Sequence, residues 1–90
     1  MDYDDIYLSR EGVKCAVVCE KDYNNATFKY NYIDENGRLM SPDWFDEWKI
    51  GYNDENIVYF KKGDKQYKLD LRSGDFTDIT GNSRYSLIFR

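Results

Sequence analysis

Hydrophobic and polar residues alternate along most of this chain, which is the pattern of β-strands that turn one face toward a core. The alternation runs through the segments 13–20, 28–34, 57–62, 66–72 and 84–90. Turn residues separate these segments, and the Asn36-Gly37 dipeptide suits a tight hairpin. We therefore predict a mainly β fold, an antiparallel sheet of about five to seven strands built from repeated hairpins.

One segment departs from the alternation and favours a short helix near 42–48. Pro42 suits the first helical position and follows a serine that suits the N-cap. Trp44 and Trp48 would then lie one turn apart on the same face, and Phe45 would lie about 100° away. The sequence therefore predicts at least one large exposed ring here, next to the carboxylates of the same segment.

Length and composition limit the chain to one small domain. It has 90 residues, of which 41% are hydrophobic and 18% aromatic, a composition that excludes a disordered tail. No apolar run approaches the roughly 18 residues of a membrane span. The acidic start lacks the positive and apolar regions of a signal peptide. We expect a single domain over 1–90, in the cytoplasm and without membrane contact.

Cys15 and Cys19 are the only cysteines. On a strand they would share a face about 13 Å apart, too far for a disulfide, whose Cα atoms lie within roughly 7 Å. The chain has no histidine, so a zinc site would need carboxylates as its remaining ligands. We predict two reduced core residues and no metal.

Two stretches of the chain, 32–37 and 68–74, look alike, because each follows a tyrosine-bearing strand and leads through aspartate to a glycine turn. This predicts repeat-like units at approximately 12–48 and 50–80. Turns made of aspartate and glycine also occur in unrelated hairpins, so chance similarity is the alternative.

The first unit resembles the WG-type repeat family, short β-rich repeats of bacterial and phage proteins. The segment 30–40 follows the family's aromatic–Gly–aromatic–Ile–Asp–x–x–Gly–Lys turn and apolar pair, and 44–47 follows its aromatic–Asp motif. Tyr30-Asn31 stands where the family has Trp-Gly, and the second copy has an extra residue before Gly74. The resemblance covers roughly 12–76. It implies a structural or binding module with no catalytic residues.

Few residues in this sequence are candidates for catalysis. Without histidine, acid–base catalysis would need paired carboxylates, such as Asp43 with Asp46 or Glu47, or Asp54 with Glu55. These pairs fall at a predicted helix start and in a turn, where acidic residues serve capping and solubility. No glycine-rich phosphate loop is present. We expect a protein that is not an enzyme and binds no cofactor.

The charge balance bears on the class of partner. The 17 acidic and 13 basic residues give a net charge of −4, which argues against a general nucleic-acid binder. Aromatic side chains flanked by lysines keep a single-stranded nucleic-acid-binding sheet open as an alternative, and the rings that could stack on bases are Phe28, Tyr30, Tyr32, Tyr59 and Phe60. Tyrosine and tryptophan are frequent in protein interfaces, and acidic clusters suit a basic partner surface.

The sequence thus favours a non-enzymatic protein-binding domain. By analogy with anti-CRISPR proteins, it would be a phage or mobile-element inhibitor that binds a host nucleic-acid-handling protein. A WG-repeat-like scaffolding module remains the other alternative. The predicted partner-binding residues are Asp43, Trp44, Asp46, Glu47, Trp48, Asp54 and Glu55.

Overall fold

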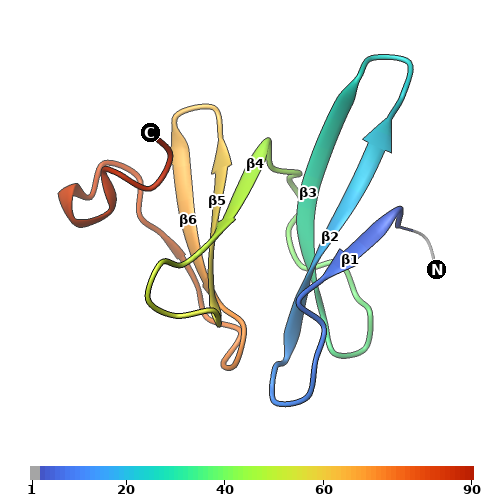
Figure 1. Cartoon of the computed structure of the whole chain (residues 1–90), viewed down its shortest axis with the longest axis horizontal. Coiled ribbons are helices and arrows are strands. Elements are labelled where there is room, and N and C mark those ends of the chain that lie inside the picture. The colour runs from blue at the N-terminus through green and yellow to red at the C-terminus, as the bar shows by residue number, and fades with distance from the viewer. Residues whose placement is uncertain (1–2) are drawn as a thin grey trace.

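The computed structural model describes residues 3–90, whose seven strands form two antiparallel sheets (Figure 1). Sheet A consists of β1 (Asp5–Tyr7), β2 (Cys15–Asp22) and β3 (Thr27–Asp34), in that order. Sheet B consists of β4 (Glu47–Ile50), β5 (Ile57–Lys62), β6 (Lys65–Asp70) and β7 (Phe76–Asp78). Within each sheet, every strand pairs with its neighbour in sequence, so both sheets are meanders.

The mainly β, antiparallel fold class is confirmed, but the strands form two sheets instead of one. The chain leaves sheet A at Phe45, whose backbone pairs with Tyr30 of β3. The next amide, that of Asp46, donates to the Lys61 carbonyl of β5 at 2.8 Å. Because adjacent residues bond to different sheets, one meander ends here and the other begins.

The predicted helix near 42–48 is wrong, because this segment is extended. The N–H and C=O groups of Phe45 bond with those of Tyr30 at 2.7 and 2.9 Å, and β4 begins at Glu47. So short a helix is marginal without tertiary packing. Burial of the Phe45 ring, which is 2% exposed, favours the extended form instead.

The strand predicted over 84–90 is also wrong. A 3₁₀ helix, Ser83–Tyr85, forms there, and the asparagine that precedes it caps its start. This C-terminal segment lies over the outer face of sheet B, where the Tyr85 ring packs 5.9 Å from that of Tyr59. Among residues 3–90, no helix is long and apolar enough to cross a membrane.

The main core lies between the two sheets, which appear as two layers in Figure 1. Cys15, Val17 and Tyr32 of sheet A pack there with side chains of sheet B. The members from sheet B and from its connections are Phe45, Val58, Phe60, Leu69 and Leu71. Both cysteines are buried and free, as the sequence predicted.

We expect both thiols of the native protein to resist modification. Burial raises the pKa of Cys15 and that of Cys19, so little thiolate forms near neutral pH. Ellman's reagent should detect no fast-reacting thiol in buffer and two thiols per chain in denaturant. Replacing both by alanine should lower the free energy of unfolding by at most about 3 kcal/mol. A fast-reacting thiol in the folded protein would contradict this placement.

Candidate functional site

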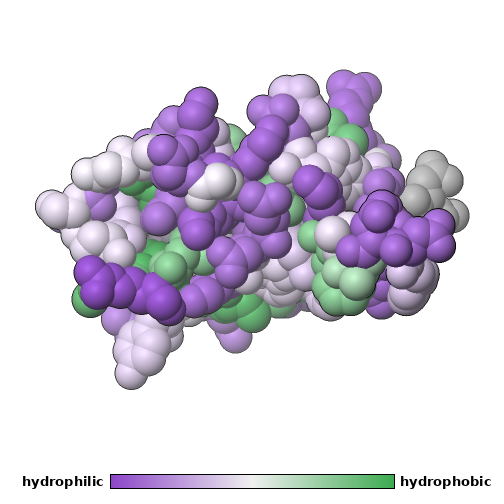
Figure 2. All heavy atoms as spheres, turned by 90° about the horizontal axis from the view of Figure 1, so that it is seen from above, coloured by the Kyte–Doolittle hydropathy of each residue, from purple (hydrophilic) through white to green (hydrophobic). Residues whose placement is uncertain are grey.

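Three of the acidic residues predicted to bind the partner lie beside lysines, at the end of the molecule that carries the β5–β6 turn. Figure 2 shows mostly hydrophilic side chains at this end. The ion pairs are Asp43 with Lys62 at 3.4 Å, Asp46 with Lys29 at 3.9 Å and Glu47 with Lys61 at 3.7 Å. Such exposed pairs contribute at most about 1 kcal/mol each. A basic partner would therefore compete with lysines of this same chain for the three carboxylates.

The two tryptophans predicted to bind the partner lie on opposite faces of sheet A. Trp44 is on its outer face, with its ring 6.3 Å from that of Tyr3. Trp48 is between the sheets, 5.2 Å from the ring of Tyr7. Both indoles are half-buried and Phe45 is buried, so this segment presents no fully exposed ring. The exposed ring expected here depended on the helix, which does not form.

Asp54 and Glu55 lie at the other end of β4, in the turn 51–56 that leads into β5. The Asp54 carboxylate accepts the Asn56 amide at 2.8 Å and faces Arg72 at 3.3 Å. The backbone carbonyl of Glu55 accepts from Arg10, while the residue itself is exposed. The seven predicted partner-binding residues are thus divided between the two ends of sheet B and the two faces of sheet A, and they do not form one surface.

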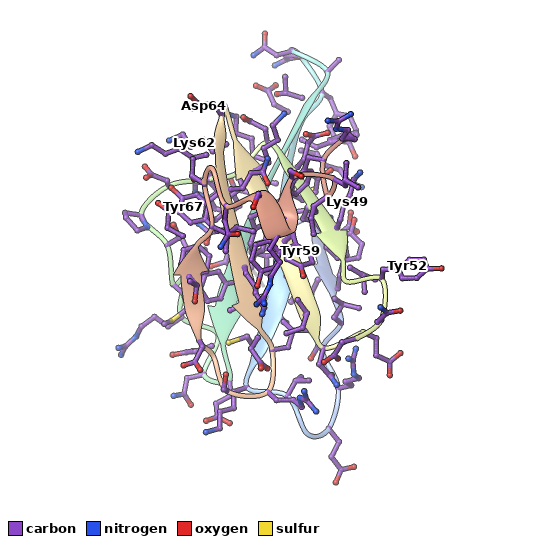
Figure 3. The ribbon with its side chains drawn as sticks, turned by 90° about the vertical axis from the view of Figure 1, so that its left-hand side faces the viewer. Lys49, Tyr52, Tyr59, Lys62, Asp64 and Tyr67 are labelled. Atoms are coloured by element: carbon purple, nitrogen blue, oxygen red, sulfur yellow. The ribbon has the colours of Figure 1, made fainter. Side chains whose placement is uncertain are left out.

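The same turn carries a residue that the sequence analysis missed. Tyr52 is 99% exposed, and Figure 3 shows it projecting away from the sheets. Two exposed apolar side chains, Ile50 and Leu87, line a groove of about 460 Å³ beside it. Its exposure could have been expected from the sequence, because Tyr52 lies outside every alternating segment, next to Gly51 and a run of polar residues.

Hydrogen bonds close the turn that carries Tyr52. The Gly51 amide donates to the Ile57 carbonyl at 2.7 Å, and the Ile57 amide donates to the Asp54 carbonyl at 3.1 Å. A Cβ atom at Gly51 would lie only 2.9 Å from that Asp54 oxygen, so glycine is required for this close approach. The turn therefore fixes the backbone on both sides of Tyr52, while the ring itself extends into solvent.

The rings considered for base stacking are mostly turned inward. Tyr32 and Phe60 are buried between the sheets with their rings 6.1 Å apart, and Tyr30 packs against the same core. Tyr59 lies under the C-terminal segment, and Phe28 alone is exposed, at 50%. These five side chains do not form a continuous stacking platform.

Two carboxylates with lowered pKa values, those of Asp22 and Asp78, bond to residues of their own turns. Bonds from Asn25 lower the pKa of Asp22, and bonds from Thr80 lower that of Asp78. Both carboxylates thereby fix turns of the chain. Over residues 3–90, no group of three or more cysteine, aspartate or glutamate side chains is placed to hold a metal ion.

Comparisons with models of protein families, with curated proteins and with solved structures gave no match to this chain. The function of this chain must therefore be inferred from its exposed surface.

Proposed function

We propose that this chain is a non-enzymatic protein-binding domain that contacts its partner through the β4–β5 turn. The observation that carries the proposal is Tyr52, a ring 99% exposed on a turn closed by backbone hydrogen bonds. An exposed ring adds nothing to the core. A tyrosine side chain offers a large contact area at a low cost in conformational entropy, which makes it a frequent anchor of protein interfaces.

The surroundings of Tyr52 support a partner of a particular chemistry. Ile50 and Leu87 extend the apolar surface, and they are 47% and 70% exposed. Glu55 adds a carboxylate in the same turn. A partner with an apolar pocket for the ring would complement this arrangement. Its border would carry acidic as well as basic residues, because Lys49 and Arg84 line the groove while Glu55 lies in the turn. The chain's net charge of −4 would favour the approach of a partner that is basic overall.

For the biological role, we propose inhibition of a host nucleic-acid-handling protein in the cytoplasm, as phage and mobile-element inhibitors do. The acidic composition supports a partner with a basic surface. The two free, buried thiols are compatible with a reducing compartment.

A WG-repeat-like module is a second candidate, supported by two matching turns. The carboxylates of Asp34 and Asp70 each accept the amide two residues downstream at 2.9 Å. Gly37 and Gly74 then donate back to the carbonyls of these aspartates with φ angles of 81° and 83°. Such a module would scaffold other proteins.

The first test compares two exposed tyrosines in turns. Tyr52→Ser is expected to reduce partner capture at least about tenfold, because truncating an interface anchor commonly costs more than 1 kcal/mol. The matched control is Tyr23→Ser in the β2–β3 turn, whose ring is 79% exposed. Both variants should melt within about 2 °C of the wild type.

The measurement is quantitative affinity capture from a lysate of the cells in which the protein functions, followed by mass spectrometry. A protein retained by the wild type and by Tyr23→Ser, but lost with Tyr52→Ser, would identify the partner. Equal retention by both variants would place the interface elsewhere.

A further inference from the structure

β4 is the first strand of sheet B, and β5 is the only strand with which it pairs. Three of its four residues are exposed. Figure 3 shows this edge of the sheet, with Lys49 on β4 and Tyr52 just beyond the end of the strand. The free edge of β4 therefore lies next to the ring on which the proposed function rests.

The register of β4 determines which of its backbone groups face outward. The Gly51 amide donates to the Ile57 carbonyl at 2.7 Å, so these two residues form a hydrogen-bonded pair. Such pairs alternate with unbonded pairs along an antiparallel ladder. The N–H and C=O groups of Trp48 and Ile50 therefore point away from β5. No backbone hydrogen bond within residues 3–90 uses these outward groups.

The other sheet edges offer less room for an added strand. The outer side of β3 is already occupied, because its backbone pairs with Leu39 and Phe45 of the connection that follows it. β1 and β7 have three residues each, one fewer than β4. Among the strands of residues 3–90, β4 thus has the longest edge that is still free.

The charged side chains of β4 leave this edge unprotected. Sheet edges are commonly protected by charged side chains, above all by lysine. Lys49, however, donates from its Nζ to the Ile88 carbonyl at 2.9 Å and lies 5.4 Å from the centre of the Phe89 ring. The Glu47 carboxylate lies 3.7 Å from the Nζ of Lys61 on β5. Both charged groups are thus turned toward other parts of this chain.

The groove beside the edge adds a preference for charge. Lys49 and Arg84 line it, whereas no carboxylate of residues 3–90 does. Neither cation forms an ion pair with a carboxylate of these residues. Ile50 and Leu87 supply apolar surface in the same groove. A bound segment with an apolar side chain and a carboxylate therefore finds complementary groups here.

We infer that an extended segment of the partner binds along β4 as a fifth strand of sheet B. The backbone of this segment exchanges hydrogen bonds with Trp48 and Ile50, and these bonds supply affinity. Its alternating side chains supply specificity, since a carboxylate on one face meets Lys49 and Arg84. The inference rests on the proposed function, because Tyr52 contacts the same partner just beyond the edge.

The probe for this edge is a displayed library of random peptides about ten residues long, selected on the immobilised wild-type chain. We expect the enriched peptides to alternate apolar with polar residues and to carry a carboxylate. Amide hydrogen exchange followed by NMR then locates the bound peptide. An enriched peptide should slow exchange of the Trp48 and Ile50 amides at least about tenfold. The Lys49 amide, which points toward β5, is the internal control and should change little.

Two variants test the edge independently of exchange. Ile50→Pro removes an outward N–H, a position at which an edge strand tolerates proline, and Ile50→Val is its matched control. Both should melt within about 4 °C of the wild type, and the proline variant should bind the peptide at least about tenfold more weakly than the valine variant. Arg84→Glu lies outside every strand and should also weaken binding about tenfold. If Ile50→Pro is unstable, exchange and Arg84→Glu decide the result.

Several outcomes would overturn the added strand. They are a selection that enriches no peptide, a bound peptide that leaves both amides unprotected, and unchanged binding by Arg84→Glu or by a folded Ile50→Pro. Protection that arises in the chain alone and grows with its concentration would also overturn it, because a second copy would then occupy the edge. A partner that is lost with Tyr52→Ser but retained by Ile50→Pro would refute the added strand and leave the proposed function in place.

Discussion

Replacing Phe60 by alanine is expected to lower the free energy of unfolding by about 3–5 kcal/mol. The ring is 0% exposed and lies where the two sheets meet. It stacks 4.7 Å from Phe45 and 6.1 Å from Tyr32, and these rings come from different parts of the chain. Because backbone pairing fixes both neighbours, they cannot collapse into the cavity, and the loss should approach the upper end of the range.

Urea unfolding followed by circular dichroism measures this loss as a shift of the transition midpoint. Phe28→Ala is the matched control, because the Phe28 ring is 50% exposed. That variant should lose no more than about 1 kcal/mol. If both variants lost the same stability, Phe60 could not be the centre of the packing between the sheets.

Asn31→Asp is expected to cost about 2–4 kcal/mol at neutral pH. Asn31 is 0% exposed, and its Nδ2 donates to the carbonyls of Ser41 and Asp43 at 2.9 and 3.2 Å. The substitution keeps the shape but removes both donors and sets a carboxylate against two carbonyl oxygens. It should therefore release the connection that brings Trp44 over the outer face of sheet A.

The cost of Asn31→Asp should depend on pH. Burial and the facing carbonyls raise the pKa of the introduced carboxyl in the folded state above its unfolded value of about 3.9. The folded variant then binds more protons than the unfolded chain, so its stability falls as pH rises from about 4 toward 7. The deficit relative to wild type should be smallest near pH 4.

Thermal unfolding of wild type and variant across this pH range measures the effect. Asn24→Asp, in the exposed β2–β3 turn, is the control and should show little pH-dependent deficit. A deficit for Asn31→Asp that does not change with pH would mean that the position is hydrated and does not hold the connection.

Alternation in the sequence predicted the long strands because the core constrains one face of each. β2, β3, β5 and β6 all fall on predicted segments. The three remaining strands have three or four residues, too few for a period of two to be recognised. The segment 42–48 carried local helix signals, but pairing between Phe45 and a strand distant in sequence overrode them.

The surface was harder to predict because it depends on register between distant strands. Nothing local to Asp43 indicates that Lys62 will lie 3.4 Å away. Tyr52 is one of nine tyrosines, and its exposure follows from the closure of a turn around Gly51.

We propose that this protein acts by stoichiometric binding through Tyr52. Calorimetric titration of the purified captured partner with the wild-type chain tests it most directly. The predicted result is saturation at a fixed molar ratio, with the partner chemically unchanged, and loss of the binding heat with Tyr52→Ser but not with Tyr23→Ser. Chemical change of the partner by substoichiometric amounts of the chain, or equal heats from both variants, would contradict the claim.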